Sequence, residues 1–156
     1  MKADDRLGAL LEAFVNEVSH PRGRALSFLA KSQVTVDQAI LLNHALTEPG
    51  STPTTLAGKM NLTLPSVSQM IERLVSQGLA RRVEDQHDRR KRTIEPTPKA
   101  KTFLARFRSV RIEEFESAIE HVSEGTRRKL VTAITEALRE LDEEAVRQSN
   151  HQESKS

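Results

Sequence analysis

Four polar side chains lie on the outer face of one amphipathic segment near the middle of the chain. The segment, from about residue 64 to 77, carries apolar residues at helical spacing, which predicts a helix with one buried face. The residues left facing outward include short hydrogen-bonding groups and a cation: Ser66, Ser68, Gln69 and Arg73. A Gln amide can pair with adenine through two hydrogen bonds, and a Ser hydroxyl can contact a base or a phosphate. These side chains are therefore suited to the recognition of a polar surface.

A second, shorter helix is predicted just before this one, from about Pro53 to Met60. Thr52 can cap its start, and Pro53 suits the first helical position, where its missing N–H has no intrahelical partner. Ala57 is small enough for two helices to cross closely. The pair is typical of a helix-turn-helix, whose second helix enters the DNA major groove. An ordinary helical hairpin with a polar outer face is the alternative interpretation.

The residues after the pair predict a β-hairpin. Residues 79–84 alternate as a short strand, residues 85–90 form a polar turn, and residues 92–95 form a return strand. The cations at or beside the tip are Arg89, Arg90, Lys91 and Arg92. An arginine there can enter a narrow minor groove, and Asp88 is placed to hold the Arg90 guanidinium. The alternative is a solvated charged turn.

Taken together, these segments resemble the MarR (multiple antibiotic resistance regulator) family of winged-helix transcription factors. The likeness covers about residues 34–104, and it is carried by Leu74, Gly78, Leu79, Arg81 or Arg82, Asp88, Arg89, Arg90 and Thr97. Pro96 and Ala100 replace the usual Leu and Gly. The resemblance implies a mainly α (α+β) fold, a winged helix-turn-helix with N- and C-terminal helices forming a dimerisation domain. It also implies that Asp88 orients Arg90 for the minor groove.

The flanking segments carry long apolar stripes. The first stripe fits a helix from about Asp4 to Ser19, and the last fits a helix from about Glu124 to Gln148. The N-terminal stripe either closes a core of its own or packs on a second subunit. We favour the second alternative, because both stripes exceed what a winged-helix core needs. The predicted organisation is residues 1–34 for an N-terminal dimerisation segment, 35–97 for the DNA-binding lobe, 98–148 for C-terminal dimerisation helices and 149–156 for a disordered tail.

The helices next to the lobe carry signals of their own. Thr35 and Gln38 have the spacing of a capping box, and the helix that they open is expected to bury Ile40, Leu41, Leu42 and Ala45. In the pair's second helix, the residues expected to be buried are Val67, Met70, Ile71, Leu74 and Val75. Thr97 is the expected cap of the helix that Pro98 opens. Lys99 and Lys101 on that helix are either phosphate contacts or a solvated pair.

Composition narrows the function further. The net charge is only +2, but residues 59–111 hold 13 basic and 5 acidic side chains, which leaves 11 basic and 17 acidic residues elsewhere. A basic middle between acidic flanks is typical of a protein with one DNA-facing side. The absence of Cys excludes disulfides and the reactive-Cys, peroxide-sensing branch of the family. No metal-ligand spacing, apolar span or signal-peptide core is found, so we expect a soluble cytoplasmic protein without metal, cofactor or membrane partner.

The leading hypothesis is therefore a homodimeric, sequence-specific DNA-binding transcriptional regulator. It would bind a pseudo-palindromic operator and act as a repressor that a small aromatic or phenolic ligand relieves, through pocket residues that the sequence leaves unknown. One alternative is a winged-helix regulator without a small-molecule effector, controlled by its abundance or by a protein partner. Another is a winged-helix protein-interaction module. No catalytic motif is present, so we expect no enzyme activity.

Overall fold

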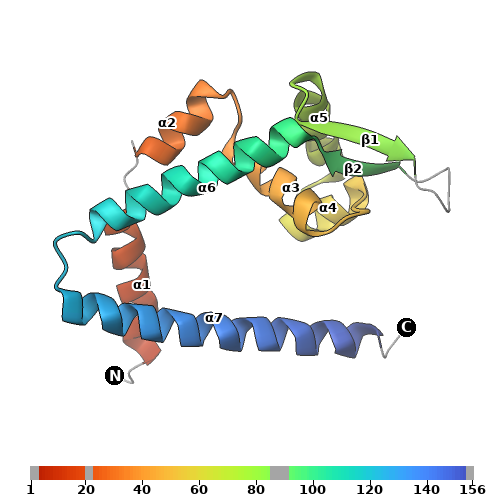
Figure 1. Cartoon of the computed structure of the whole chain (residues 1–156). Helices are drawn as coiled ribbons and strands as arrows, with labels where there is room; N and C mark the ends of the chain where they lie inside the picture. Colours follow the sequence, from red (N-terminus) through yellow and green to blue (C-terminus); the bar gives the residue numbers. More distant parts are fainter. Residues whose placement is uncertain (1–3, 20–22, 85–91, 154–156) are drawn as a thin grey trace. The chain divides into compact units, whose positions relative to one another are not determined.

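The computed structural model describes residues 4–19, 23–84 and 92–153. It divides into two compact units, one up to Phe115 and one from Glu116 onward. The first unit holds α1 (Asp4–Val18), α2 (Arg24–Lys31), α3 (Val36–Thr47), α4 (Pro53–Met60), α5 (Leu64–Ser76), β1 (Ala80–Glu84), β2 (Arg92–Pro96) and most of α6 (Pro98–Ala118) (Figure 1). The second unit consists mainly of α7 (Glu124–Glu153). No helix in the described ranges is long and apolar enough to cross a bilayer.

Side-chain caps fix where the helices of the lobe begin. The Thr35 hydroxyl accepts a hydrogen bond from the Gln38 N–H, and the Gln38 side chain accepts one from the Thr35 N–H, which completes the predicted capping box. Thr52 and Thr55 form the same reciprocal pair before α4, where Pro53 is the first helical residue. These local hydrogen bonds satisfy N–H groups that a helix cannot satisfy internally. The starts of α3 and α4 are therefore confirmed.

The turn between α4 and α5 depends on one residue in the left-handed conformation. Asn61 has φ of 51°, and the N–H of Leu62 donates to the carbonyl of Ala57, which closes the end of α4. Asn is one of the few residues other than glycine that adopts this conformation readily. After α5, Gly78 with φ of 70° turns the chain directly into β1. The helix-turn-helix and the hairpin are thus consecutive along the chain.

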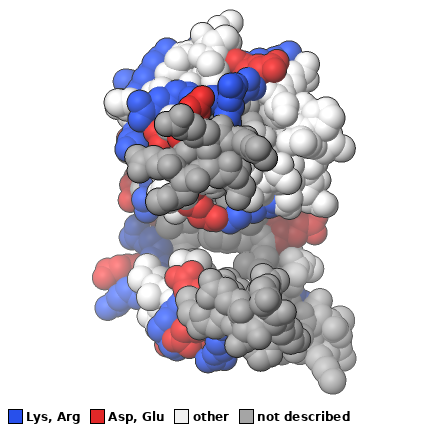
Figure 2. Space-filling model, turned by 90° about the vertical axis from the view of Figure 1, so that its right-hand side faces the viewer, with Lys and Arg blue, Asp and Glu red and all other residues white. Residues whose placement is uncertain are grey.

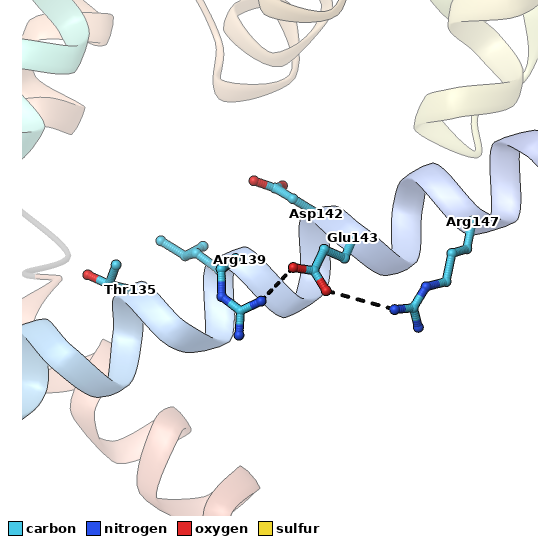
Figure 3. A pocket seen from close by; sticks show the side chains of 6 residues that line it. Thr135, Arg139, Asp142, Glu143 and Arg147 are labelled. Atoms are coloured by element: carbon cyan, nitrogen blue, oxygen red, sulfur yellow. Dashed lines mark hydrogen bonds and ion pairs between the residues drawn. The ribbon is translucent and has the colours of Figure 1, made fainter.

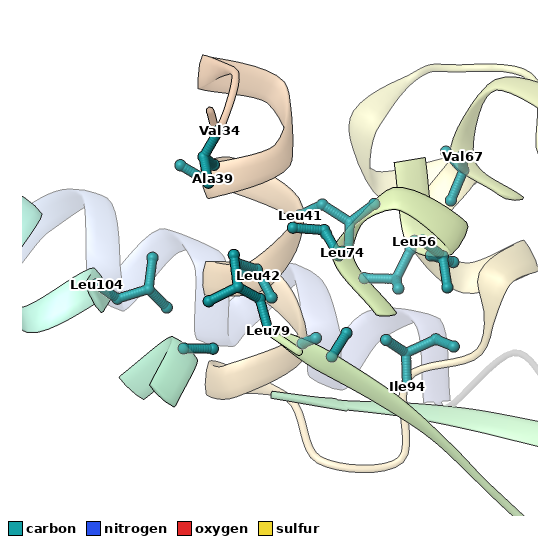
Figure 4. Close-up of a cluster of buried hydrophobic side chains, with 14 of the residues drawn as sticks. Val34, Ala39, Leu41, Leu42, Leu56, Val67, Leu74, Leu79, Ile94 and Leu104 are labelled. Carbon is teal, nitrogen blue, oxygen red and sulfur yellow. The ribbon is translucent and has the colours of Figure 1, made fainter. Parts of the chain in front are cut away.

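The core of the lobe lies where α3, α4 and α5 meet the two strands (Figure 4). Its fully buried side chains are Leu41, Leu42, Leu56, Val67, Ile71, Leu74 and Ile94. The whole buried cluster contains residues from five helices and both strands, with Leu104 of α6 at its edge. Because each fully buried Leu or Ile contributes about 1.5–3 kcal/mol, this cluster fixes α5 against the rest of the lobe.

Two residues predicted to be buried are exposed. Ile40 is 42% exposed because the buried face of α3 is centred on Gln38, Leu42 and Ala45, and Ile40 lies on the opposite side. Val75 is 39% exposed because it lies at the border of the buried stripe of α5, in its last turn. Met70 is only half-buried. The remaining apolar positions predicted for the core of α5 are buried.

The wing is a two-stranded antiparallel sheet in which Arg82 pairs with Ile94 and Ala80 with Pro96. One further backbone hydrogen bond joins the Ile94 N–H to the Ser51 carbonyl at 2.9 Å, so the turn before α4 contacts the outer edge of β2. The Thr97 hydroxyl accepts from the Ala100 N–H and caps α6 as expected. The last helix runs to Glu153, beyond the predicted end at Gln148, because no Gly or Pro interrupts residues 149–153.

Candidate nucleic-acid interface

The outer face of α5 presents the side chains that the sequence singled out. Gln69 and Arg73 are exposed one turn apart, and Ser68 beside Gln69 is half-buried. On the opposite face, Val67, Ile71 and Leu74 are fully buried. The helix therefore cannot rotate without exposing its apolar side, so the direction of Gln69 and Arg73 is fixed by the core. A Gln amide and a guanidinium in this arrangement offer several donors and one acceptor to a partner.

The first turn of α5 carries a hydroxyl pair. The Thr63 Oγ1 and Ser66 Oγ atoms are 2.8 Å apart, and the Ser66 N–H donates to Thr63 Oγ1 at 3.4 Å. Both residues are exposed. Thr63 is also the N-cap of α5, and the sequence did not predict that its hydroxyl would hold that of Ser66. The Ser66 side chain is therefore held at the start of the helix and keeps capacity for further hydrogen bonds.

Two arginines at the base of the wing are neutralised by neighbouring carboxylates. Arg81 on β1 contacts Glu95 on β2, with Nη2 2.6 Å and Nε 3.0 Å from Oε2. Arg82 Nη2 lies 3.7 Å from Glu72 Oε1, which joins the wing to the outer face of α5. Neither pairing was predicted, although opposite charges that face each other across antiparallel strands, as Arg81 and Glu95 do, favour such pairs. Arg73 and Arg92, both exposed, make no ion pair within the described part of the chain.

The remaining predicted DNA contacts divide between β2 and the segment that joins the two strands. Arg92 begins β2, where its side chain is exposed. Asp88, Arg89, Arg90 and Lys91 lie outside the described residues, so the predicted contact between Asp88 and Arg90 stays a prediction. Figure 2 views the side on which the two strands end, and it shows Lys and Arg side chains beside acidic ones and an uncharged area. The charge on this side is mixed.

Lys99 has a structural contact that neither sequence interpretation included. Its Nζ donates to the Gln77 carbonyl at 2.8 Å, and the Thr97 hydroxyl donates to the Gly78 carbonyl at 2.7 Å. Both bonds join the start of α6 to the end of α5. Lys99 and Lys101 are both exposed, but Lys99 is engaged with the protein through this hydrogen bond. A lysine side chain has no sequence signal for such a contact, because its partner is a carbonyl 22 residues away.

A helix-turn-helix that runs directly into a two-stranded hairpin defines a winged-helix protein. Residues 32–91 match the model of the MarR family. The family is one of DNA-binding transcriptional regulators and not of enzymes, which agrees with the sequence prediction. A comparison with curated proteins found no match.

Solved structures with the same fold include several MarR-type proteins. A MarR family protein from Bacillus stearothermophilus has a TM-score of 0.72 at 22% identity, with 94% of this chain and 99% of that chain covered. The S. aureus MepR–DNA complex has a TM-score of 0.63 at 21% identity, covering 88% and 98%. Wild-type MarR from E. coli in its apo form has a TM-score of 0.65 at 18% identity, covering 85% and 96%. At these identities the likeness establishes the fold.

Proposed function

We propose that this protein is a homodimeric, sequence-specific DNA-binding transcriptional regulator. The observation that carries the proposal is the fixed orientation of α5, which buries Ile71 and Leu74 completely and presents Gln69 and Arg73 outward. The MarR family match of the same segment and the described DNA complex of one structural relative support it. In a winged helix, the second helix of the pair lies in the major groove with its N-terminal residues at base edges.

The proposed contacts involve different parts of the DNA. Ser66, Ser68 and Gln69 contact base edges, and Gln69 is suited to a bidentate contact with adenine. Arg73, Arg89, Lys91 and Arg92 contact phosphates, which position the protein without reading sequence. Arg90, oriented by Asp88, enters the minor groove. Arg81 and Arg82 are not among the proposed DNA contacts, because each is already paired with a carboxylate.

The dimer is proposed from exposed apolar faces on α1 and on α7, each described within its own unit. On α1 the exposed apolar residues are Leu7, Leu10, Leu11, Phe14 and Val15, and on α7 they are Val131, Ile134, Leu138 and Leu141. Leu10 is 58% and Leu141 66% exposed, although both lie on regular apolar stripes. Contiguous apolar stripes of this length are rare on monomers and mark interaction surfaces. A two-fold dimer would present two α5 helices to successive major grooves, which requires a pseudo-palindromic operator.

An open hollow of about 700 Å³ on α7 fits this interpretation better than a ligand site. All of its lining residues belong to α7, and Figure 3 shows Arg139, Glu143 and Arg147 joined along one helix face. The Arg139 Nη1 to Glu143 Oε1 distance is 2.5 Å, and the Arg147 Nη2 to Glu143 Oε2 distance is 3.8 Å. A small-molecule pocket needs walls that enclose its ligand, and one helix does not provide them.

We further propose that the regulator is a cytoplasmic repressor relieved by a small aromatic or phenolic ligand. The support is a half-buried stack of Phe28, Phe103 and Phe107 at the contact between α2 and α6, with ring centroids 5.4–6.4 Å apart. The Arg111 guanidinium lies 5.8 Å from the Phe107 ring centroid and offers a cation beside these rings. Titration with benzoate, followed by thermal unfolding and operator release, tests this part alone. Unchanged unfolding and unchanged binding across a panel of aromatic acids would contradict it.

The central test is an unbiased selection of duplexes from a random library. We expect enriched sequences with inverted half-sites, and affinity that exceeds that for random duplex by 10³-fold or more, on the order seen for specific binders. Sedimentation equilibrium of the free protein should give a dimer at micromolar concentration. Binding without any enriched sequence, which vanishes at moderate salt, would favour a non-specific binder or the interaction-module alternative.

A further inference from the structure

The last turn of α5 is joined to two other parts of the lobe through one residue. Gln77 follows the final residue of the helix, and its side-chain Nε2 donates to the Gln33 carbonyl at 2.9 Å. Its own carbonyl accepts from Lys99 Nζ at 2.8 Å. Gln77 therefore connects the end of α5 to the joint between α2 and α3 on one side and to α6 on the other. These partners are 44 and 22 residues away in the sequence.

The joint that Gln77 contacts has an unusual backbone. Gln33 has φ of 55°, which is uncommon for a residue with a side chain, and it lies between the end of α2 and the start of α3. Its N–H donates to the Ala30 carbonyl, and the next N–H, of Val34, donates to the Leu29 carbonyl. The last turn of α2 is thus closed by backbone hydrogen bonds, and the Gln33 carbonyl accepts the hydrogen bond from Gln77 Nε2. The position of α2 is therefore linked directly to the end of α5.

The opposite end of α2 is held by a distant carboxylate. The N-cap of α2 is Gly23, which has no side chain to cap the helix. Glu114 of α6 takes that role, because its Oε2 accepts a hydrogen bond from the Ala25 N–H at 3.2 Å. A carboxylate at a helix N-terminus satisfies a free N–H and interacts favourably with the helix dipole. A methyl group at residue 23 would overlap Glu114 Oε1, so the glycine leaves room for this contact.

Between its two ends, α2 packs on α6 through aromatic rings. Phe28 stacks on Phe103 with centroids 5.4 Å apart and an interplanar angle of 24°. It also stacks on Phe107 at 6.2 Å. In Figure 1 α2 runs beside α6. One short helix is thus held to α6 at its start and middle and to α5 beyond its end.

We propose that α2 is a brace that fixes the recognition helix α5 relative to α6, with Glu114 and Gln77 as the positioning residues at its two ends. Release of either end frees the last turn of α5, although Glu114 itself contacts only the start of α2. The consequence for operator binding rests on the proposed function. The mechanical coupling between the two ends of α2 does not rest on the proposed function, so it can be measured on the free protein.

The test is hydrogen exchange on the full-length protein and on Glu114→Gln, Gly23→Ala and Gln77→Met. Glu114→Gln removes the charge of the cap, Gly23→Ala displaces an unchanged carboxylate, and Gln77→Met keeps the side-chain length but removes the donor. The reporters are the N–H groups of Gly78 and Leu79, which donate to the Val75 and Leu74 carbonyls at the end of α5. Amides of α4 are the reference, and Glu113→Gln, a neighbouring exposed acid on α6, is the matched control.

We expect all three variants to raise exchange at Gly78 and Leu79 by more than about twofold relative to α4, and the control to leave it unchanged. Substitutions at distant sites without shared partners normally act independently to within about this factor. A response at the α5 end to Gln77→Met alone would overturn the proposal. A uniform rise across α4 and α5 in the Glu114 and Gly23 variants would also overturn it, because it would mark general loss of stability.

A second measurement uses a selected operator. Glu114→Gln and Gln77→Met should each weaken operator binding, and the double variant should be no weaker than the more affected single variant. Effects that multiply would show that the two ends act separately and would contradict the brace. If the wild type prefers no duplex at all, the proposed function fails, and the exchange experiment still decides whether the brace exists.

Discussion

Arg81 and Glu95 face each other across the two strands of the wing, with Nη2 of the arginine 2.6 Å from Oε2 of the glutamate. Their side chains are 68% and 40% exposed, so the pair contributes little to stability, on the order of 1 kcal/mol or less. Its larger effect is electrostatic, because it removes one net positive charge from the wing. The Arg82–Glu72 pair, at 3.7 Å, acts in the same way. Few cations near α5 are therefore left without a carboxylate partner among the described residues.

Neutralising Glu95 should therefore increase non-specific DNA binding. In Glu95→Gln the Arg81 guanidinium loses its partner and becomes available to phosphates. We expect higher affinity for random duplex and a salt slope steeper by about one unit, with unfolding changed by less than about 1 kcal/mol. Titrations at two salt concentrations measure both. Glu136→Gln on α7 is the control for charge alone, and equal effects of the two variants would refute the explanation.

Substitutions at Gln69 and at Arg73 should weaken DNA binding in different ways. Gln69→Ala removes a base contact, so we expect a loss of about 1–3 kcal/mol for the operator and almost none for random duplex. Arg73→Ala removes a phosphate contact, so both affinities should fall and the salt slope should decrease by about one unit. Ser76→Ala, in the last turn of the same helix, is the control. An identical pattern for the two variants would contradict the assigned roles.

Arg90→Ala tests the wing. We expect weaker operator binding at both of two salt concentrations, a smaller effect on random duplex and unchanged thermal unfolding, because an arginine in a narrow minor groove reads its shape. Asp88→Ala should reproduce part of the loss, since it removes the side chain proposed to orient Arg90. If Arg90→Ala leaves folding and operator affinity at the wild-type level, the wing has no role in binding.

A charge placed on the exposed apolar faces should separate the subunits. Leu10→Glu on α1 and Leu138→Glu on α7 alter side chains that are 58% and 56% exposed in the single chain. In a dimer each would become an unpaired buried carboxylate, which costs several kcal/mol. We expect monomers in sedimentation equilibrium and weak operator binding. Leu26→Glu on α2, where the leucine is 43% exposed, should remain a dimer. If all three variants are dimers, the dimer interface does not include these apolar faces of α1 and α7.

Two apolar residues of α5, one buried and one exposed, allow a matched comparison of the free energy of unfolding. Ile71→Ala empties a fully buried position and should lower the free energy of unfolding by about 2–5 kcal/mol. Val75→Ala, at a position 39% exposed, should change it by less than about 1 kcal/mol. Denaturant unfolding followed by circular dichroism measures both. Similar costs would mean that the buried face of α5 is not oriented as described.

The sequence by itself determined the elements and the outward residues of α5. Thr35, Thr52 and Thr63 mark helix starts through bonds to residues three positions away, and the apolar spacing of Val67, Ile71 and Leu74 selects the buried face. Such signals are local, so they can be read along the chain. Local reading failed for Val75, at the edge of its stripe, and for Ile40, opposite the buried face of α3, because the centre of a buried face depends on what packs against it.

Only the tertiary structure decided which polar groups pair. The contacts of Glu114 with α2, of Gln77 with Gln33 and of Arg81 with Glu95 join residues 89, 44 and 14 positions apart. A Glu, Gln or Arg has many partners of equal chemistry in this chain, and its composition does not select among them. The fold selects them by distance, because a hydrogen bond forms only when donor and acceptor lie about 3 Å apart.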